Sequence, residues 1–207
     1  MDLLNIPRLD KRSIKKFANR AAKSYDNAAI LHEEVLNRLL ERLQYIRHQP
    51  ETIIDVGSGT GRGVPGLQKT YPRARIYAAD IAHEMLLQAR TRLSLLSKKR
   101  LVAADMEQLP FADQSFDLVF SSLALPWSND VGATLKELSR VSRPGALLMF
   151  SSFGLVPVSE ALSGALGRWN LTLLFITAAT LMGGVALWAA TQPALASVSR
   201  GLARQET

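Results

Sequence analysis

The sequence predicts an α/β protein built on a parallel β-sheet. Short apolar runs rich in β-branched residues alternate with amphipathic segments from about residue 52 to residue 152, and this alternation is typical of parallel strands joined by helices. The chain has 207 residues, of which 47% are hydrophobic and 21% charged, values that suit one globular α/β domain. Cysteine is absent and the three histidines are scattered, so neither a disulfide framework nor a metal site is expected.

Two amphipathic helices are expected before the first strand. Residues 1–23 are rich in Lys and Arg, and an apolar stripe recurs within them at helical spacing. That stripe consists of Ile14, Phe17, Ala18 and Ala21. Residues 28–47 carry a second stripe, and Pro50 marks its end. A transit peptide is the alternative for the first segment, but no cleavage site follows it.

A glycine-rich turn follows the first predicted strand, residues 52–56. Gly57, Gly59 and Gly61 stand at alternate positions there, and glycine lets a backbone turn sharply and approach a bulky ligand closely. The dinucleotide pattern has its third glycine where this chain has Arg62, and the phosphate-loop pattern is also absent. A nucleoside is therefore favoured over a pyrophosphate, with a turn that serves packing alone as the alternative.

Polar residues end the other predicted strands. Asp80 closes the second apolar run, and a carboxylate in that place accepts hydrogen bonds from two ribose hydroxyls. Asp105 ends a third run and Ser122 a fourth, and a fifth lies within 141–150. Helices are expected near 62–70, 83–97 and 130–141. Ligands of such sheets bind beyond the carboxyl ends of the strands, so Gly57 and these three polar residues are expected to share one site.

The last part of the chain has a different character. The stretch 171–190 carries no charge and approaches the roughly 20 apolar residues that a membrane-spanning helix needs. Trp169 and Trp188 are placed as interfacial anchors. Its threonines and the pair Gly183 and Gly184 make the stretch only moderately apolar, so a buried helix or a disordered tail is the alternative.

The formal net charge of +7 leaves several kinds of partner open. A basic surface is compatible with nucleic acid, with an acidic protein partner, or simply with a well-solvated surface. The first segment, residues 1–23, contributes much of the positive charge.

These motifs, in this order, resemble a known enzyme family. Asp55-x-Gly57-x-Gly59-x-Gly61 followed by Asp80 is similar to motifs I and II of the class I S-adenosylmethionine-dependent methyltransferases. The segments 109–122 and 141–150 are similar to two further turn-and-strand segments of that family. The resemblance implies a Rossmann-like doubly wound parallel sheet of the class I methyltransferase type, with S-adenosylmethionine as the cofactor.

The resemblance also implies roles for single residues. The implied cofactor-binding residues are Asp55, Gly57, Ser58, Gly59, Asp80, Ile81, Asp105, Met106, Ser122 and Leu123. Within this set, Asp80 would take the ribose hydroxyls, Asp105 would lie beside the adenine, and Ser122 would line the methyl-transfer end. Tyr25 is expected to be a lid residue near the methyl acceptor, with an aromatic that serves helix packing as the alternative.

The N-terminal segment narrows the family. A second resemblance, over about residues 14–154, is carried by Phe17, Tyr25-Asp26, His32, Leu123–Trp127 and Ser151–Gly154. It points to the malonyl-[acyl-carrier-protein] O-methyltransferases of biotin synthesis. It implies that residues 1–48 cover the active site, that residues 49–155 bind the cofactor, and that the free carboxylate of the malonyl group is esterified. The implied partner is an acidic acyl-carrier protein and not nucleic acid, in the cytoplasm.

The tail departs from that family. Nothing after residue 155 matches the last two strands of the family's seven-stranded sheet, so we expect the sheet to lack them. Residues 156–207 are then an atypical apolar tail with a helix at 171–190, which would allow contact with a membrane. Two other functions stay open: another small-molecule methyltransferase, acting on a quinone or a lipid, and an inactive remnant that binds the cofactor.

Overall fold

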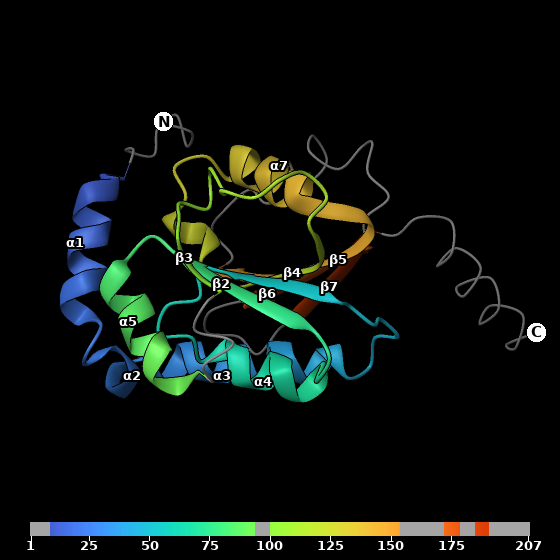
Figure 1. Cartoon of the computed structure of the whole chain (residues 1–207), viewed down its shortest axis with the longest axis horizontal. Helices are drawn as coiled ribbons and strands as arrows, with labels where there is room; N and C mark the ends of the chain where they lie inside the picture. Colours follow the sequence, from blue (N-terminus) through green and yellow to red (C-terminus); the bar gives the residue numbers. More distant parts are fainter. Residues whose placement is uncertain (1–8, 94–99, 154–171, 179–184, 191–207) are drawn as a thin grey trace, which may run out of the picture.

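The computed structural model describes residues 9–93, 100–153, 172–178 and 185–190. They form a seven-stranded sheet with the order β3-β2-β1-β4-β5-β6-β7 (Figure 1). Strands β1 to β6 run parallel, and β7 is antiparallel to β6. The strands are β1 Thr52–Val56, β2 Arg75–Asp80, β3 Leu101–Ala103, β4 Phe116–Ser122, β5 Ser142–Phe153, β6 Thr172–Ala178 and β7 Val185–Ala190.

Helices cover both faces of this sheet, with α3 and α4 on one face and α7 on the other (Figure 1). The helices are α1 Lys11–Ala21, α2 Tyr25–Ala28, α3 Ile30–Leu43, α4 Gly63–Thr70, α5 His83–Arg92 and α7 Val131–Val141, with a 3-10 helix, η1, at Leu125–Trp127. Neighbouring residues of a strand point to opposite faces. In β1, the side chain of Ile53 belongs to a buried apolar cluster with residues of α3 and α4. The side chain of Ile54 belongs to a second buried cluster with residues of α7. The predicted doubly covered parallel sheet is confirmed.

Helix α3 follows from its apolar spacing. Val35, Leu36, Leu39 and Leu43 are buried and form one stripe along the helix. The helix expected over 28–47 is shorter in the structure, because Ala29 has a ψ of 37°, far from the helical value, and α3 begins only at Ile30. The short helix α2 precedes it and ends at Ala28.

The first helix is attached differently from the others. The side chain of Asp10 accepts the N–H of Arg12 at 3.0 Å and caps the start of α1. No residue of α1 is fully buried, although the helix lies beside α5 (Figure 1). The position of α1 therefore depends on contacts other than the burial of apolar side chains in the core.

The sheet has its topological switch at β1, which pairs with β2 on one side and β4 on the other. The connection after β1 and the connection after β4 leave in opposite directions across the sheet. In open parallel sheets such a point leaves a crevice beyond the carboxyl ends of the strands. The loops after β1, β2, β3 and β4 meet there.

The C-terminal stretch differs from the expectation. The sheet does not stop after its fifth strand, and the stretch 171–190 contains strands β6 and β7 in place of an apolar helix. β-Branched residues such as Ile176 and Thr177 favour strands. The free edge of β5 also presents unpaired backbone groups, which β6 satisfies. In the part of the chain that is described, no helix has the length and apolar character to cross a membrane.

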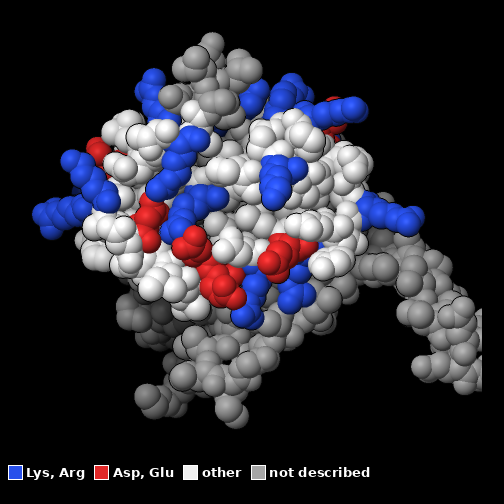
Figure 2. Space-filling view, turned by 90° about the horizontal axis from the view of Figure 1, so that it is seen from below, with Lys and Arg blue, Asp and Glu red and all other residues white. Residues whose placement is uncertain are grey.

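The two signs of charge are distributed unevenly over the surface. The face that α3 and α4 cover carries acidic and basic side chains close together (Figure 2). Ion pairs account for part of this mixture, such as Arg62 with Glu33 at 2.5 Å and Arg38 with Glu34 at 2.7 Å. Helix α1 contains no acidic residue, so every charged side chain on its outer side is basic.

Candidate functional site

A cavity of about 320 Å³ lies at the carboxyl ends of the central strands. Its walls include Gly57 and Gly59 after β1, Asp80 and Ile81 after β2, Ala104, Asp105 and Met106 after β3, and Ser122, Leu123 and Ala124 after β4. Asp55 and Ser58 line a smaller cavity of about 60 Å³ that shares part of this wall. The structure therefore brings the residues implied by the sequence to one place, divided between two adjoining cavities.

The loop after β1 folds over the end of β2. The N–H groups of Gly57 and Ser58 donate to the Ala79 carbonyl at 2.8 and 3.0 Å. Gly57 has a φ of +70°, and a Cβ there would lie 2.2 Å from the Cβ of Ala124, so only glycine fits. Gly59 has a φ of +53° with open space beside its Cα. Its backbone is therefore accessible to a ligand in the cavity.

Asp80 holds this loop from the neighbouring strand. Its Oδ2 accepts the N–H of Gly59 and its Oδ1 accepts the N–H of Ala82, each at 2.8 Å. Burial raises the pKa of Asp80, although the two backbone hydrogen bonds act in the opposite direction. Each carboxylate oxygen retains a second lone pair, so Asp80 can still accept hydrogen bonds from a ligand.

Asp55 lies below the loop, inside β1, with 3% of its surface exposed. Burial, and after it the charge of Asp80, raises the pKa of Asp55 to about 7. A Cβ on Gly63, the first residue of α4, would lie 2.8 Å from Oδ2 of Asp55. The backbone of α4 therefore begins directly against this carboxyl group.

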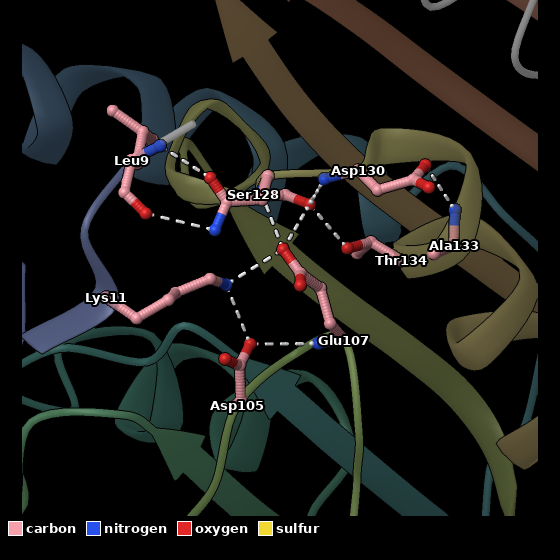
Figure 3. Close-up of polar contacts among 9 residues, drawn as sticks. Leu9, Lys11, Asp105, Glu107, Ser128, Asp130, Ala133 and Thr134 are labelled. Carbon is pink, nitrogen blue, oxygen red and sulfur yellow. Dashed lines mark hydrogen bonds and ion pairs between the residues drawn. The ribbon is translucent and has the colours of Figure 1, made fainter. Parts of the chain in front are cut away.

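A lysine of α1 joins the two acidic residues of the loop after β3 (Figure 3). The Nζ of Lys11 lies 2.9 Å from Oδ1 of Asp105 and 2.8 Å from Oε1 of Glu107. Burial raises the pKa of Glu107, but hydrogen bonds from Lys11, the N–H of Asn129 and the hydroxyl of Ser128 outweigh it and lower that pKa. Asp105 lines the cavity, and its Oδ1 is already paired with Lys11.

The turn after β4 is held in an unusual conformation. Leu123 has a φ of +54°, which is rare for a residue with a branched side chain. Its N–H donates to the Oγ and to the carbonyl of Ser151, both at 3.1 Å. Conformations of this kind persist where the surrounding structure enforces them, and they cluster at functional sites. The turn brings Ser122 and Leu123 to the cavity wall.

Tyr25, at the start of α2, lines both cavities. Its ring meets that of His32 edge-on, with 5.8 Å between the ring centres. Burial, followed by the charges of Asp80 and Asp26, raises the pKa of the Tyr25 phenol. The hydroxyl therefore stays protonated at neutral pH.

A comparison with known families finds a match over the segment that contains much of this site. Residues 54–150 match the family model described as a methyltransferase domain. These residues form a methyltransferase domain. The methyltransferase domain runs from β1 into β5, so it contains the glycine loop, Asp80, Asp105 and Ser122. Lys11 and Tyr25 lie outside it, on the helices that precede it.

Curated relatives extend the likeness beyond the methyltransferase domain. The chain is 41% identical over 161 residues to the malonyl-[acyl-carrier protein] O-methyltransferase of Halorhodospira halophila, covering 78% of this chain and 53% of the relative. It is 45% identical over 152 residues to the protein of the same name from Gallionella capsiferriformans, covering 70% of this chain and 52% of the relative. The chain thus spans about half the length of the curated relatives it matches.

Solved structures agree on the fold of the methyltransferase domain. An S-adenosylmethionine-dependent methyltransferase from Aquifex aeolicus matches with a TM-score of 0.61 at 20% identity, covering 83% of this chain and 97% of that one. An amino pentose methyltransferase from Micromonospora echinaspora, solved with S-adenosylmethionine bound, matches with a TM-score of 0.52 at 23% identity, covering 63% of this chain and 54% of that one. The class I methyltransferase fold is therefore confirmed.

The groups around the main cavity fit S-adenosylmethionine chemically. Asp80 offers lone pairs for ribose hydroxyls, and Ile81 and Met106 supply apolar walls for an adenine ring. In the smaller cavity the hydroxyl of Ser58 is buried and has no hydrogen-bond partner among the described residues. Buried polar groups rarely stay without a partner, so this hydroxyl is available to the ligand.

The resemblance implied that residues 1–48 cover the active site, but apart from Tyr25 it assigned none of their side chains to the cavity wall. Helix α1 contributes Lys11, Ile14, Phe17 and Ala18, and α5 contributes Met85. Helical spacing revealed an apolar stripe on the first helix but could not show what the stripe covers. The structure shows that it covers the candidate cofactor site of the methyltransferase domain.

Proposed function

We propose that the protein is an S-adenosylmethionine-dependent O-methyltransferase that esterifies the free carboxylate of a malonyl group carried by an acyl-carrier protein. The observation that carries this proposal is the 41% and 45% identity to relatives of that name. The alternatives are a different small-molecule acceptor and a protein that binds the cofactor without turnover.

Different residues of the chain would bind different parts of the cofactor. Asp80 would accept hydrogen bonds from the ribose, and Gly59 would let the ligand approach the loop. Ile81 and Met106 would enclose the adenine, and Ser122 and Leu123 would line the methyl-transfer end. Asp105 would take the exocyclic amine with the oxygen that Lys11 leaves free. When bound, the cofactor supplies a methyl group already activated by a sulfonium. The protein's task is then alignment and the exclusion of water.

The proposed acceptor needs no general base. A carboxylate is ionised at neutral pH, so it is a competent nucleophile without proton removal. Tyr25 stands beside the glycine loop at the junction of the two cavities, and its protonated phenol can donate a hydrogen bond that orients the acceptor. Burial lowers the pKa of the neighbouring His32, which keeps that ring neutral and adds no charge that would compete for the carboxylate.

The outer side of α1 suits an acidic carrier protein. Arg12, Lys15, Lys16 and Arg20 are exposed along it, and the helix has no acidic residue. Phe17, on the same helix, lines the cavity and is 69% exposed, so the basic surface adjoins the cavity wall. Such complementarity acts mainly on the rate of encounter and on specificity.

The test is methyl transfer from radiolabelled S-adenosylmethionine to malonyl-acyl-carrier protein, with acetyl-acyl-carrier protein as the matched substrate control. Acetyl lacks the free carboxylate, so we expect label only on the malonyl form, as a base-labile ester. Binding of the cofactor without label on either form would reject this acceptor and favour another small molecule or a remnant. Failure of the folded protein to bind the cofactor would reject the methyltransferase proposal as a whole.

A further inference from the structure

The segment that precedes the methyltransferase domain, residues 9–28, forms one wall of the main cavity. Lys11, Ile14, Phe17, Ala18, Ala21 and Tyr25 of this segment all line it. We propose that Lys11 and Asp26 are positioning residues that fasten the segment at its two ends to the loops of the cofactor site. Closure of the segment and binding of the cofactor then stabilise each other. This inference rests on the proposed cofactor site.

The first fastening is at the start of α1 (Figure 3). The Nζ of Lys11 bridges Asp105 and Glu107 at 2.9 and 2.8 Å. The side chains of all three residues are less than one third exposed, at 23%, 31% and 24%. Glu107 is fixed in turn, because its Oε1 accepts the hydroxyl of Ser128 at 3.0 Å. An interaction between one lysine and two partly buried carboxylates stabilises the fold more than a single exposed ion pair does.

A backbone clamp supports this fastening. The N–H of Leu9 donates to Oδ1 of Asn129 at 2.6 Å, and Nδ2 of Asn129 donates to the Leu9 carbonyl at 3.1 Å. The same amide side chain therefore satisfies both polar groups of one residue ahead of α1. The clamp sets the position from which Lys11 reaches the loop after β3.

The second fastening is at α2, next to Tyr25. Asp26 Oδ1 accepts the hydroxyl of Thr60 at 2.6 Å, and Oδ2 of Asp26 pairs with Arg92. Arg92 Nη1 also donates to the Thr60 carbonyl at 2.9 Å. Thr60 is buried between Gly59 and Gly61 in the glycine loop. Asp26 therefore ties the helix that carries Tyr25 to the loop that would contact the cofactor.

The middle of the segment is held by little apolar area. Ala22 packs with Ala82 and Met85 in a small buried cluster, with Ala18 and Tyr25 at its edge. No residue of α1 is itself buried, so burial of apolar side chains cannot hold the helix firmly. In the middle, one hydrogen bond joins the N–H of Glu84 in α5 to Oδ1 of Asn19 at 2.9 Å. The ion pairs lie at the two ends, so we expect these ends to determine whether the segment stays over the cavity.

The two fastenings reach opposite parts of the proposed cofactor site. Lys11 acts on the loop of Asp105 and Met106, which would hold the adenine, and Asp26 acts on the glycine loop. A ligand that orders both loops also orders the partners of Lys11 and Asp26. Coupling of this kind is reciprocal, so loss of either fastening should weaken the binding of the ligand. The affinity should fall by a factor of about ten, for a coupling free energy in the middle of the usual range.

The test compares the folded full chain with Lys11→Met and Asp26→Asn. Lys11→Arg and Asp26→Glu are the conservative rescue variants, and Glu34→Gln is the matched control, because Glu34 pairs with Arg38 on an exposed face at 2.7 Å. The measurements are the calorimetric Kd for S-adenosylmethionine and the hydrogen exchange of the α1 amides, with and without the cofactor. Circular dichroism verifies the fold of each variant.

We expect the Kd to rise about tenfold in Lys11→Met and in Asp26→Asn, with faster exchange of the α1 amides. The rescue variants should recover most of both effects, and Glu34→Gln should change neither. Folded variants with the wild-type Kd and wild-type exchange would overturn the inference. If the wild type does not bind the cofactor, the proposed function fails, and exchange of α1 in the free protein still decides whether Lys11 and Asp26 fasten the segment.

Discussion

The pKa of Asp55 is raised to about 7 by burial and, after burial, by the charge of the neighbouring Asp80. The two residues lie on neighbouring parallel strands, β1 and β2, beneath the glycine loop. One of them lines the main cavity and the other lines the smaller one. A proton on Asp55 therefore relieves repulsion beneath the proposed cofactor site.

Stability should depend on pH through Asp55. Its pKa is above the ordinary 3.8 when the protein is folded, so the folded state binds the proton more tightly than the unfolded chain. The stabilising contribution is then complete below about pH 4 and is lost as the pH rises to about 7. We expect the Tm of wild type relative to Asp55→Asn to fall across this window and stay level above it. A Tm difference independent of pH would contradict the assignment.

Removing the charge of Asp80 should move that window. Asp80→Asn keeps the shape of the side chain but removes the repulsion that helps to raise the pKa of Asp55. We expect the pH-dependent part of the Tm to shift to lower pH in this variant, because burial alone then raises that pKa. An unchanged window would show that burial accounts for the whole effect.

Binding of the cofactor should depend on Asp80 itself. Asp80→Ala removes the proposed ribose acceptor and leaves the N–H groups of Gly59 and Ala82 without their partner. Loss of hydrogen bonds to a charged group costs about 1.5–3 kcal/mol, so calorimetry should show S-adenosylmethionine binding weakened by roughly 10- to 100-fold. Asp113→Ala is the control, because Asp113 pairs with Arg140 at an exposed position. Equal effects of both variants would refute the assignment.

Two glycines of one loop should respond differently to a methyl group. Gly57→Ala meets Ala124 at 2.2 Å in addition to an unfavourable φ, so we expect a loss of about 3 kcal/mol in the free energy of unfolding. Gly59→Ala meets nothing within 4 Å, so its loss should be about 1–2 kcal/mol, from the backbone alone. Its new methyl group should instead weaken cofactor binding. Urea unfolding and calorimetry separate the two outcomes, and equal destabilisation would speak against this geometry.

Charge reversal on α1 should affect the protein substrate and not the cofactor. For Lys15→Glu with Lys16→Glu we expect the KM for malonyl-acyl-carrier protein to rise about tenfold at low salt, and the difference to shrink at high salt as the charges are screened. The Kd for S-adenosylmethionine should stay the same. Arg73→Glu is the control, since Arg73 is exposed at the amino end of β2, away from the cavity. A KM equally raised by Arg73→Glu would indicate a general charge effect.

Much of the site was accessible from local patterns. Glycines that permit a positive φ and an acidic residue at the end of a strand are fixed by neighbours in sequence, and Gly57 and Asp80 lie where those patterns predicted. Ser122 lines the same cavity, because parallel strands end at a common edge of the sheet. Leu123 was assigned to the site, but no local pattern predicted its left-handed backbone conformation. The hydrogen bonds that its N–H donates to Ser151 in β5 enforce that conformation.

The C-terminal strands show where local patterns fail. An uncharged stretch of this length reads equally well as a helix or as strands, because both bury apolar side chains. Only the free edge of β5 distinguishes between them, by offering a row of backbone partners. That edge exists only once the rest of the sheet has formed.

The sequence by itself determined the first five strands, the glycine turn and the acidic residues at the strand ends, since these follow from backbone sterics and hydrophobic periodicity within short windows. Only the tertiary structure decided that Lys11 reaches Asp105 and Glu107, that Asp26 meets Thr60 and Arg92, and that Asp80 perturbs Asp55. Those relationships join residues that are far apart in the chain, and charge interactions of this kind depend on distance and burial, which the fold alone supplies.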